Sequence, residues 1–153
     1  MKSKLKIQYL CLNTFAPLLI GGSIYVLYRT KSLLMFHYFK DLGIESLIDF
    51  LRLFSKNYKL CFPNWVIYSL PNALWLYSFY SFWFILWKKE EKFFLFLLIS
   101  TFSVSLLSEF LQYLYIINGS FSWMDVFFIF LSLIIFTIFH FKFFKHLLNE
   151  KIS

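Results

Sequence analysis

Four long apolar segments constrain the fold of this chain more than any other feature. They cover residues 7–28, 66–87, 93–117 and 124–141. The first two contain no Asp, Glu, Lys or Arg, the third contains only Glu109 and the fourth only Asp125. Since a helix needs about 20 mostly apolar residues to cross a bilayer, the sequence predicts an all-α membrane protein with four transmembrane helices.

Composition supports the same fold class. Hydrophobic residues make up 60% of the 153 residues and charged residues 15%, whereas soluble domains contain roughly 25% charged residues. A soluble fold of this composition could not cover its surface with polar groups, so the lipid bilayer is the expected partner of the chain. The length allows one domain, covering 1–153.

The basic residues predict the orientation of these helices. The net charge of +7 does not indicate nucleic acid binding, because the lysines lie at the ends of apolar segments. The 118–123 loop has no Lys or Arg, and the first loop carries six diluted over more than thirty residues. The positive-inside rule therefore predicts cytoplasmic N- and C-termini, from three clusters: Lys2, Lys4 and Lys6; Lys88, Lys89 and Lys92; Lys142, Lys145 and Lys151.

The first loop contains an amphipathic pattern over 44–54. Apolar residues recur there at helical spacing, and charged residues form the opposite stripe. The pattern predicts a short helix that either lies in the outer membrane interface or packs against the other helices. The apolar stripe is Ile44, Leu47, Ile48, Leu51 and Phe54, and the polar stripe is Glu45, Asp49, Arg52 and Lys56.

Two further features bear on helix geometry. Pro71 lies inside the second apolar segment, and since proline is tolerated only in the first turn of a helix, we expect the regular helix to begin near Leu70. Gly21, Gly22 and Ser23 give the first helix a small-residue face suited to close helix contact.

The third segment carries the strongest candidate for a functional site. Thr101, Ser105, Ser108, Glu109 and Gln112 fall on one helical stripe. If this helix extends to 117, Glu109 lies roughly 12 Å below its end at about 1.5 Å per residue. A carboxylate at that depth is costly and usually faces protein or water.

The short 118–122 turn brings the next helix back beside this stripe. Ser122 or Ser120 is a plausible N-cap, and Asp125 then lies in the first helical turn. The sequence thus predicts a polar pocket in the outer leaflet in which two carboxylates share a proton or a cation; separate structural polar contacts are the alternative. The candidate ligand-binding residues are Asn72, Ser108, Glu109, Gln112 and Asp125. No metal-ligand set and no cofactor motif occurs, so neither a metal nor a cofactor is expected.

These residues resemble the VanZ-like family of bacterial integral membrane proteins. The resemblance rests on Ser108-Glu109-Phe110-Leu111-Gln112, a short turn and Trp123-Met124-Asp125. Leu70-Pro71-Asn72-Ala73-Leu74-Trp75 and the stretch from Gly21 to Arg29 are also similar to it. The sequence departs from the family pattern at Asn72 and Ser122, where the family often has carboxylates.

The resemblance implies a multi-pass protein of the bacterial cytoplasmic membrane. Together with the polar pocket and the missing carboxylates, it leads to the expectation of an accessory, non-catalytic role in which the pocket binds an envelope lipid or a glycan carrier. One alternative is a membrane enzyme with Glu109 as general acid/base and with Gln112 and Asp125 orienting the substrate. Another is a structural subunit that binds a further membrane protein.

Overall fold

The structure is a computed structural model that describes residues 7–31 and 34–140. Within these residues every regular element is a helix, so the predicted all-α class is confirmed for this part of the chain. Residue 141 of the fourth predicted segment and the lysine clusters of both termini lie outside the described residues.

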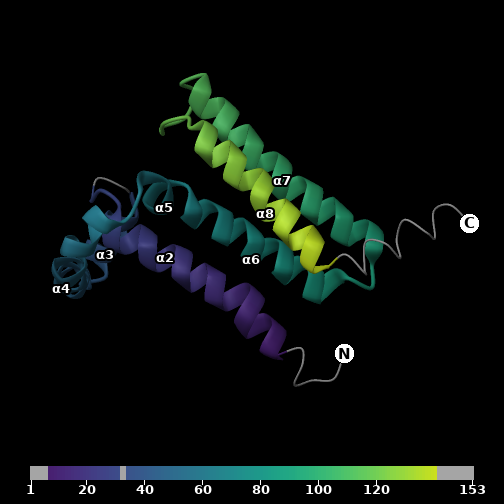
Figure 1. The fold of residues 1–153 in the computed structure, drawn as a ribbon, viewed down its shortest axis with the longest axis horizontal. Coiled ribbons are helices and arrows are strands. Elements are labelled where there is room, and N and C mark those ends of the chain that lie inside the picture. Colours follow the sequence, from purple (N-terminus) through teal and green to yellow (C-terminus); the bar gives the residue numbers. More distant parts are fainter. Residues whose placement is uncertain (1–6, 32–33, 141–153) are drawn as a thin grey trace, which may run out of the picture.

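Four long helices form the body of the protein (Figure 1). The central one, α6, lies between α2 and α8, and α7 runs beside it and α8. The first long helix is continuous over Ile7–Tyr28, and its early part is a π-helix. The bounds are η1 Leu10–Phe15, α2 Ala16–Tyr28, α6 Leu70–Trp87, α7 Glu91–Tyr113 and α8 Trp123–Phe139.

The second long helix begins where Pro71 predicts. A one-turn helix, α5 Asn64–Tyr68, precedes it, and Ser69 is the C-cap residue of this helix. α6 then begins at Leu70 with Pro71 in its first turn, where the missing proline N–H would have had no helical partner anyway. The 66–87 segment is therefore two helices, with a break at Ser69.

The third long helix is shorter than the apolar run predicts. It ends at Tyr113 rather than at residue 117, because the next residues fold into a Schellman motif. The N–H of Ile116 donates to the carbonyl of Leu111, and that of Tyr115 donates to Gln112. Tyr115 adopts φ 58°, a left-handed conformation that is uncommon for a residue other than glycine.

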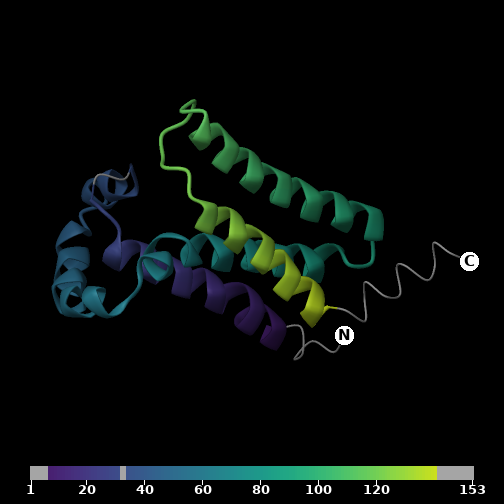
Figure 2. The same cartoon turned by 45° about the horizontal axis from the view of Figure 1, so that its top comes forward.

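Short helices gather at the end of the bundle where α2 ends, which is also the end of the α7–α8 turn (Figure 2). They are α3 Leu34–Asp41, α4 Glu45–Ser55 and the 3₁₀-helix η2 Lys56–Cys61. α3 was not predicted from the sequence; it ends in a second Schellman motif in which Gly43, at φ 70°, takes the left-handed position.

α4 matches the predicted loop helix and contacts α2 through one face. Ile48 and Ser55 are buried, and Arg52 bonds to the end of α2. Leu47 and Leu51 remain exposed together with most of the apolar stripe. The structure therefore shows the docked arrangement for one edge of α4, whereas a position in the outer membrane interface stays a prediction.

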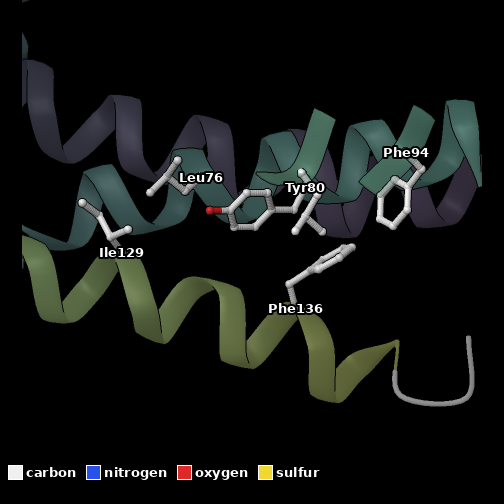
Figure 3. Packing of buried hydrophobic residues seen from close by; sticks show 6 residues of the cluster. Leu76, Tyr80, Phe94, Ile129 and Phe136 are labelled. Atoms are coloured by element: carbon white, nitrogen blue, oxygen red, sulfur yellow. The ribbon is translucent and has the colours of Figure 1, made fainter. Parts of the chain in front are cut away.

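The hydrophobic core joins α6, α7 and α8 (Figure 3). Tyr80, Phe94 and Phe136 are completely buried at the centre of this cluster, which also contains Leu76, Leu98 and Ile129. Burying an aromatic side chain is among the largest single contributions to helix packing. The core therefore fixes α7 and α8 against α6, and with them the positions of Glu109 and Asp125.

Two helices are long and apolar enough to cross a membrane. They are Ile7–Tyr28 and Glu91–Tyr113, with mean hydropathies of 1.7 and 2.0. Only 11% and 17% of the residues in the most apolar 18-residue stretch of each helix are buried in the bundle, so the other helices fully cover few of these residues. This favours association with a membrane over a place in the core of a soluble protein.

Helix contact through small residues yields a first prediction. A Cβ atom at Gly21 would lie 2.8 Å from Nε1 of Trp75 and 3.1 Å from the carbonyl oxygen of Pro71, whereas one at Gly22 would meet nothing within 4 Å. Trp75 cannot move away freely, because its Nε1 donates to the carbonyl of Leu18.

Gly21→Ala should therefore lower the free energy of unfolding by about 1–3 kcal/mol through overpacking. Gly22→Ala is the matched control and should be neutral or stabilising by up to about 1 kcal/mol, since alanine has the higher helix propensity. Thermal unfolding in a mild detergent measures both. Equal melting temperatures for the two variants would contradict the close contact between α2 and α6.

Candidate functional site

A cavity of about 880 Å³ lies at the end of the bundle that carries the α7–α8 turn. Side chains from α2, α5, α6, α7 and α8 line it, so it exists only when all long helices are assembled. Its lining contains three charged residues and a larger number of polar and aromatic ones: Tyr25, Arg29, Asn64, Trp65, Tyr68, Ser69, Asn72, Trp75, Glu109, Gln112, Asn118, Gly119, Ser120, Ser122, Met124 and Asp125.

Glu109 faces the interior of the bundle rather than its outer surface. Only 5% of its surface is exposed, while its neighbours Ser108 and Phe110 are more accessible. It lies four residues before the end of α7 at Tyr113, which is about 6 Å along the helix axis. The depth of roughly 12 Å expected from a longer helix was therefore too great, because α7 ends early.

Asp125 approaches Glu109 from the start of α8. Ser122 caps that helix, since its side chain accepts a hydrogen bond from the N–H of Met124, and this confirms the predicted N-cap. The backbone N–H of Ser122 donates to the Glu109 carboxylate, and the two carboxylates interact electrostatically. Asp125 is also buried, and the hydroxyl of Ser69 donates to it.

The hydrogen-bonding capacity of this pair is incomplete. Oε2 of Glu109 and Oδ1 of Asp125 are both enclosed and have no hydrogen-bond partner within the described part of the chain. A buried polar atom without a partner costs about 1–3 kcal/mol. Two buried carboxylates with free acceptor atoms are therefore poised to take a proton, a cation or a hydrogen-bond donor.

Arg29 supplies the positive charge of the cavity. It follows the last residue of α2 and interacts electrostatically with Asp125. Its guanidinium donates to the carbonyl of Tyr68 and lies 4.9 Å from the centre of the Tyr68 ring and 5.2 Å from that of Tyr25. Its Nε is buried and unpartnered among the described residues, so the cation retains one unused donor.

Gln112 and Asn72 complete the polar walls. The side chain of Gln112 lies so close to Gly119 that a Cβ there would fall 2.6 Å from its Cδ atom. Gly119 has φ 149°, which suits glycine. Gln112 is thereby held between the turn and the cavity.

A second cavity of about 310 Å³ adjoins the first between α6 and α7. Asn72, Trp75, Glu109 and Gln112 line both cavities. The second adds Leu76, Phe79, Ser105, Ser108 and Ile129 to the lining. The main pocket thus continues along the helices into a groove that has both polar and apolar walls.

The structure brings together four of the five candidate residues proposed from the sequence. Asn72, Glu109, Gln112 and Asp125 line the main cavity. Ser108 lines only the adjoining groove, and its hydroxyl donates to the carbonyl of Ser105 within α7.

Sequence reasoning missed Arg29 as a member of the site. The available signal was the first charge after the first apolar segment, which is equally expected of a residue that marks the end of a membrane helix. Ser69 was also missed, because a single serine before a proline-containing helix carries no specific signal.

The described residues contain no group of three His, Cys, Asp or Glu side chains suited to hold a metal ion. Comparison of the chain with protein families, curated proteins and solved structures gives no match. The function must therefore be inferred from the site itself, in an all-helical protein with two helices of membrane-crossing length.

Proposed function

We propose that the chain is a VanZ-like, four-span protein of the bacterial cytoplasmic membrane with a ligand-binding pocket in the outer leaflet. The lengths of the helices support four spans. α6 has 18 residues and α8 has 17, which at about 1.5 Å per residue gives roughly 26 Å, near the 30 Å of the hydrocarbon core. The outward faces of α8 are apolar, including Phe127, Ile134 and Ile138.

The distribution of aromatic and basic residues supports the orientation. Exposed Tyr113, Tyr115 and Trp123 surround the cavity end, as expected of an aromatic belt at a membrane interface. Lys88, Lys89 and Lys92 lie at the opposite end, where α6 ends and α7 begins. The positive-inside rule then favours a cytoplasmic position for the lysines and an outer position for the cavity.

The two free thiols test this topology. Both cysteines are exposed on the protein, but Cys11 lies within the first span and Cys61 in η2 at the cavity end. In intact cells a membrane-impermeant maleimide should label Cys61 and leave Cys11 unmodified, because lipid covers the latter. The Cys61→Ser variant should show no labelling. Labelling of Cys61 only in inverted vesicles would reverse the orientation.

α4 is proposed to rest in the outer membrane interface with its uncovered apolar face toward the lipid. Leu47, Phe50, Leu51, Leu53 and Phe54 are exposed on this helix. An exposed apolar face next to helices of membrane-crossing length suits the boundary between headgroups and acyl chains. The helix would then border the entrance of the cavity.

The function that the site supports best is the binding of an envelope lipid or a glycan carrier, in an accessory and non-catalytic role. The observation that carries this proposal is the buried pair Glu109 and Asp125: both residues line a large cavity, and one oxygen of each carboxylate is enclosed without a partner in the described chain. Two buried carboxylates that each keep one oxygen without a partner favour a binding role over a purely structural one.

A binding assay with a total lipid extract tests this proposal. The purified protein, stripped of lipid, should take up a component of the extract that native mass spectrometry can weigh. Gln112→Leu should weaken this uptake by about tenfold, which corresponds to one lost hydrogen bond to a polar ligand.

Gln8→Leu is the matched control, because Gln8 is exposed near the start of the first helix. Equal uptake by the wild type and Gln112→Leu would contradict a ligand in this cavity.

A further inference from the structure

We infer that the cavity binds the headgroup of a zwitterionic aminophospholipid, with its ammonium against Glu109 and Asp125 and its phosphate against Arg29. This inference rests on the proposed lipid-binding function and specifies the chemistry of the ligand. It follows from the arrangement of charge, from the unpartnered atoms and from the shape of the two adjoining cavities.

The charges of the cavity are separated and balanced. Arg29, Glu109 and Asp125 are the only Asp, Glu, Lys or Arg residues in the lining contributed by the described chain. Arg29 comes from the end of α2, whereas the carboxylates come from α7 and α8. Two adjacent carboxylates in a low-dielectric site do not both ionise readily, so a pair that shares one proton carries a single negative charge opposite a single positive charge.

A balanced site favours a ligand that is itself balanced. An anionic lipid would leave one uncompensated negative charge in a poorly solvated cavity, and uncompensated buried charges are costly. A zwitterion satisfies both walls at once. A primary ammonium also supplies N–H donors to the carboxylates of Glu109 and Asp125. Each of these carboxylates has one oxygen atom without a hydrogen-bond partner among the described residues.

The phosphate is assigned to the opposite wall. A guanidinium binds phosphate oxygens through several N–H groups, and Arg29 is a half-buried residue in the cavity lining. The rings of Tyr25 and Tyr68 hold this guanidinium in place. Its position is therefore set before a ligand arrives, which reduces the entropy cost of binding.

The acyl chains have a path out of the headgroup site. The adjoining groove between α6 and α7 begins at residues shared with the main cavity and continues along Leu76, Phe79 and Ile129. A ligand with a polar head and an apolar tail would fill both spaces. A small polar solute would occupy only the first, so the groove favours a lipid over a soluble amine or phosphate.

The test uses the full chain, stripped of lipid in detergent, and native mass spectrometry with defined probes. Dioleoylphosphatidylethanolamine should bind at least about tenfold tighter than dioleoylphosphatidylglycerol, which lacks the ammonium, and dioleoylphosphatidylcholine, which lacks N–H donors. Soluble glycerophosphoethanolamine should compete at least about a hundredfold less well, because it leaves the groove empty.

Isosteric variants assign the two walls. The double variant Glu109→Gln with Asp125→Asn should abolish the preference for the ethanolamine lipid, and Arg29→Gln should weaken the binding of all three phospholipids. The matched double control Lys89→Gln with Glu90→Gln alters exposed charges at the opposite end and should change nothing. If the double pocket variant does not fold, Arg29→Gln and the comparison of lipids on the wild type still decide the question.

The outcomes separate this inference from the proposed function. Tighter binding of phosphatidylglycerol, with dependence on Arg29, would overturn the ammonium assignment and leave lipid binding intact. If glycerophosphoethanolamine competes as well as the ethanolamine lipid, the ligand is a soluble molecule and the proposal of a lipid ligand is wrong. Binding of every lipid that is insensitive to all pocket variants would overturn both the inference and the proposed function.

Discussion

Glu109→Leu is expected to weaken lipid binding at least about tenfold while the protein still folds. The carboxylate lines both cavities, so its loss removes an acceptor from the point where the polar site meets the groove. One hydrogen bond to a charged group contributes about 1.5–3 kcal/mol, and 1.4 kcal/mol corresponds to a factor of ten.

The stability of this variant should stay within about 1 kcal/mol of the wild type. Leucine has a similar size, and it removes a desolvated carboxylate whose Oε2 has no partner among the described residues. The bond from the N–H of Ser122 is lost, at a cost of about 1 kcal/mol. Removal of the desolvated carboxylate raises the free energy of unfolding, whereas loss of this hydrogen bond lowers it.

Unfolding in a mild detergent and native mass spectrometry together decide this prediction. Glu109→Gln is the matched variant, because it keeps the size and one acceptor oxygen, and it should lose less binding than Glu109→Leu. A fall in unfolding free energy of about 3 kcal/mol or more for Glu109→Leu would instead mean that the carboxylate holds the helices together. The polar stripe on α7 would then be structural.

The sequence predicted the long helices well because their signal is local. An apolar run long enough to span a bilayer can be recognised without knowledge of the rest of the fold, and so can a proline that must lie in the first turn of a helix. The proline rule located the start of α6 at Leu70, and the apolar run located its end at Trp87. The N-cap at Ser122 was equally local, and the structure confirms it.

The end of α7 could not be predicted for a specific physical reason. Hydropathy continues through Ile117, and the residue that adopts the left-handed C′ position is Tyr115 rather than glycine. No composition rule marks a tyrosine as a helix terminator, because a left-handed conformation is uncommon for residues other than glycine. The depth of Glu109 was consequently misjudged.

The residues of the candidate site also fall into those that local sequence signals predict and those that they do not. The stripe of Glu109 and Gln112 and the return to Asp125 follow from helical spacing and a tight turn. Arg29 belongs to the site because α2 ends beside α5, which is a long-range contact. A single sequence holds no signal for that contact, and so the cation of the cavity emerged only from the structure.

Arg52 carries the last prediction, because it joins the loop helix to the end of α2. Its guanidinium donates to the carbonyl of Val26 at 2.6 Å and to that of Arg29 at 2.7 Å. The last carbonyl groups of a helix have no partner within that helix, and a cation there also interacts favourably with the helix dipole. Arg52 thus fixes the backbone from which the Arg29 side chain reaches the cavity.

Arg52→Ala should therefore lower the free energy of unfolding by about 2 kcal/mol, since two charge-assisted hydrogen bonds are lost at a half-buried site. Hydrogen exchange should rise in α4 and in the last turn of α2. Lipid binding should weaken as Arg29 loses its fixed position. Arg52→Lys should restore only part of the effect, because one ammonium cannot span both carbonyls as a planar guanidinium does.

Lys56→Ala is the matched control at the residue that directly follows α4, where the side chain is exposed, and it should leave stability and exchange unchanged. If Arg52→Ala exchanges like the wild type throughout α4, the loop helix is held by its apolar face alone. Arg29 would then owe its position to Tyr25 and Tyr68, and binding of the lipid would be independent of Arg52. Faster exchange confined to α4, with Arg29-dependent binding preserved, would likewise show that Arg52 anchors the loop helix without positioning the site.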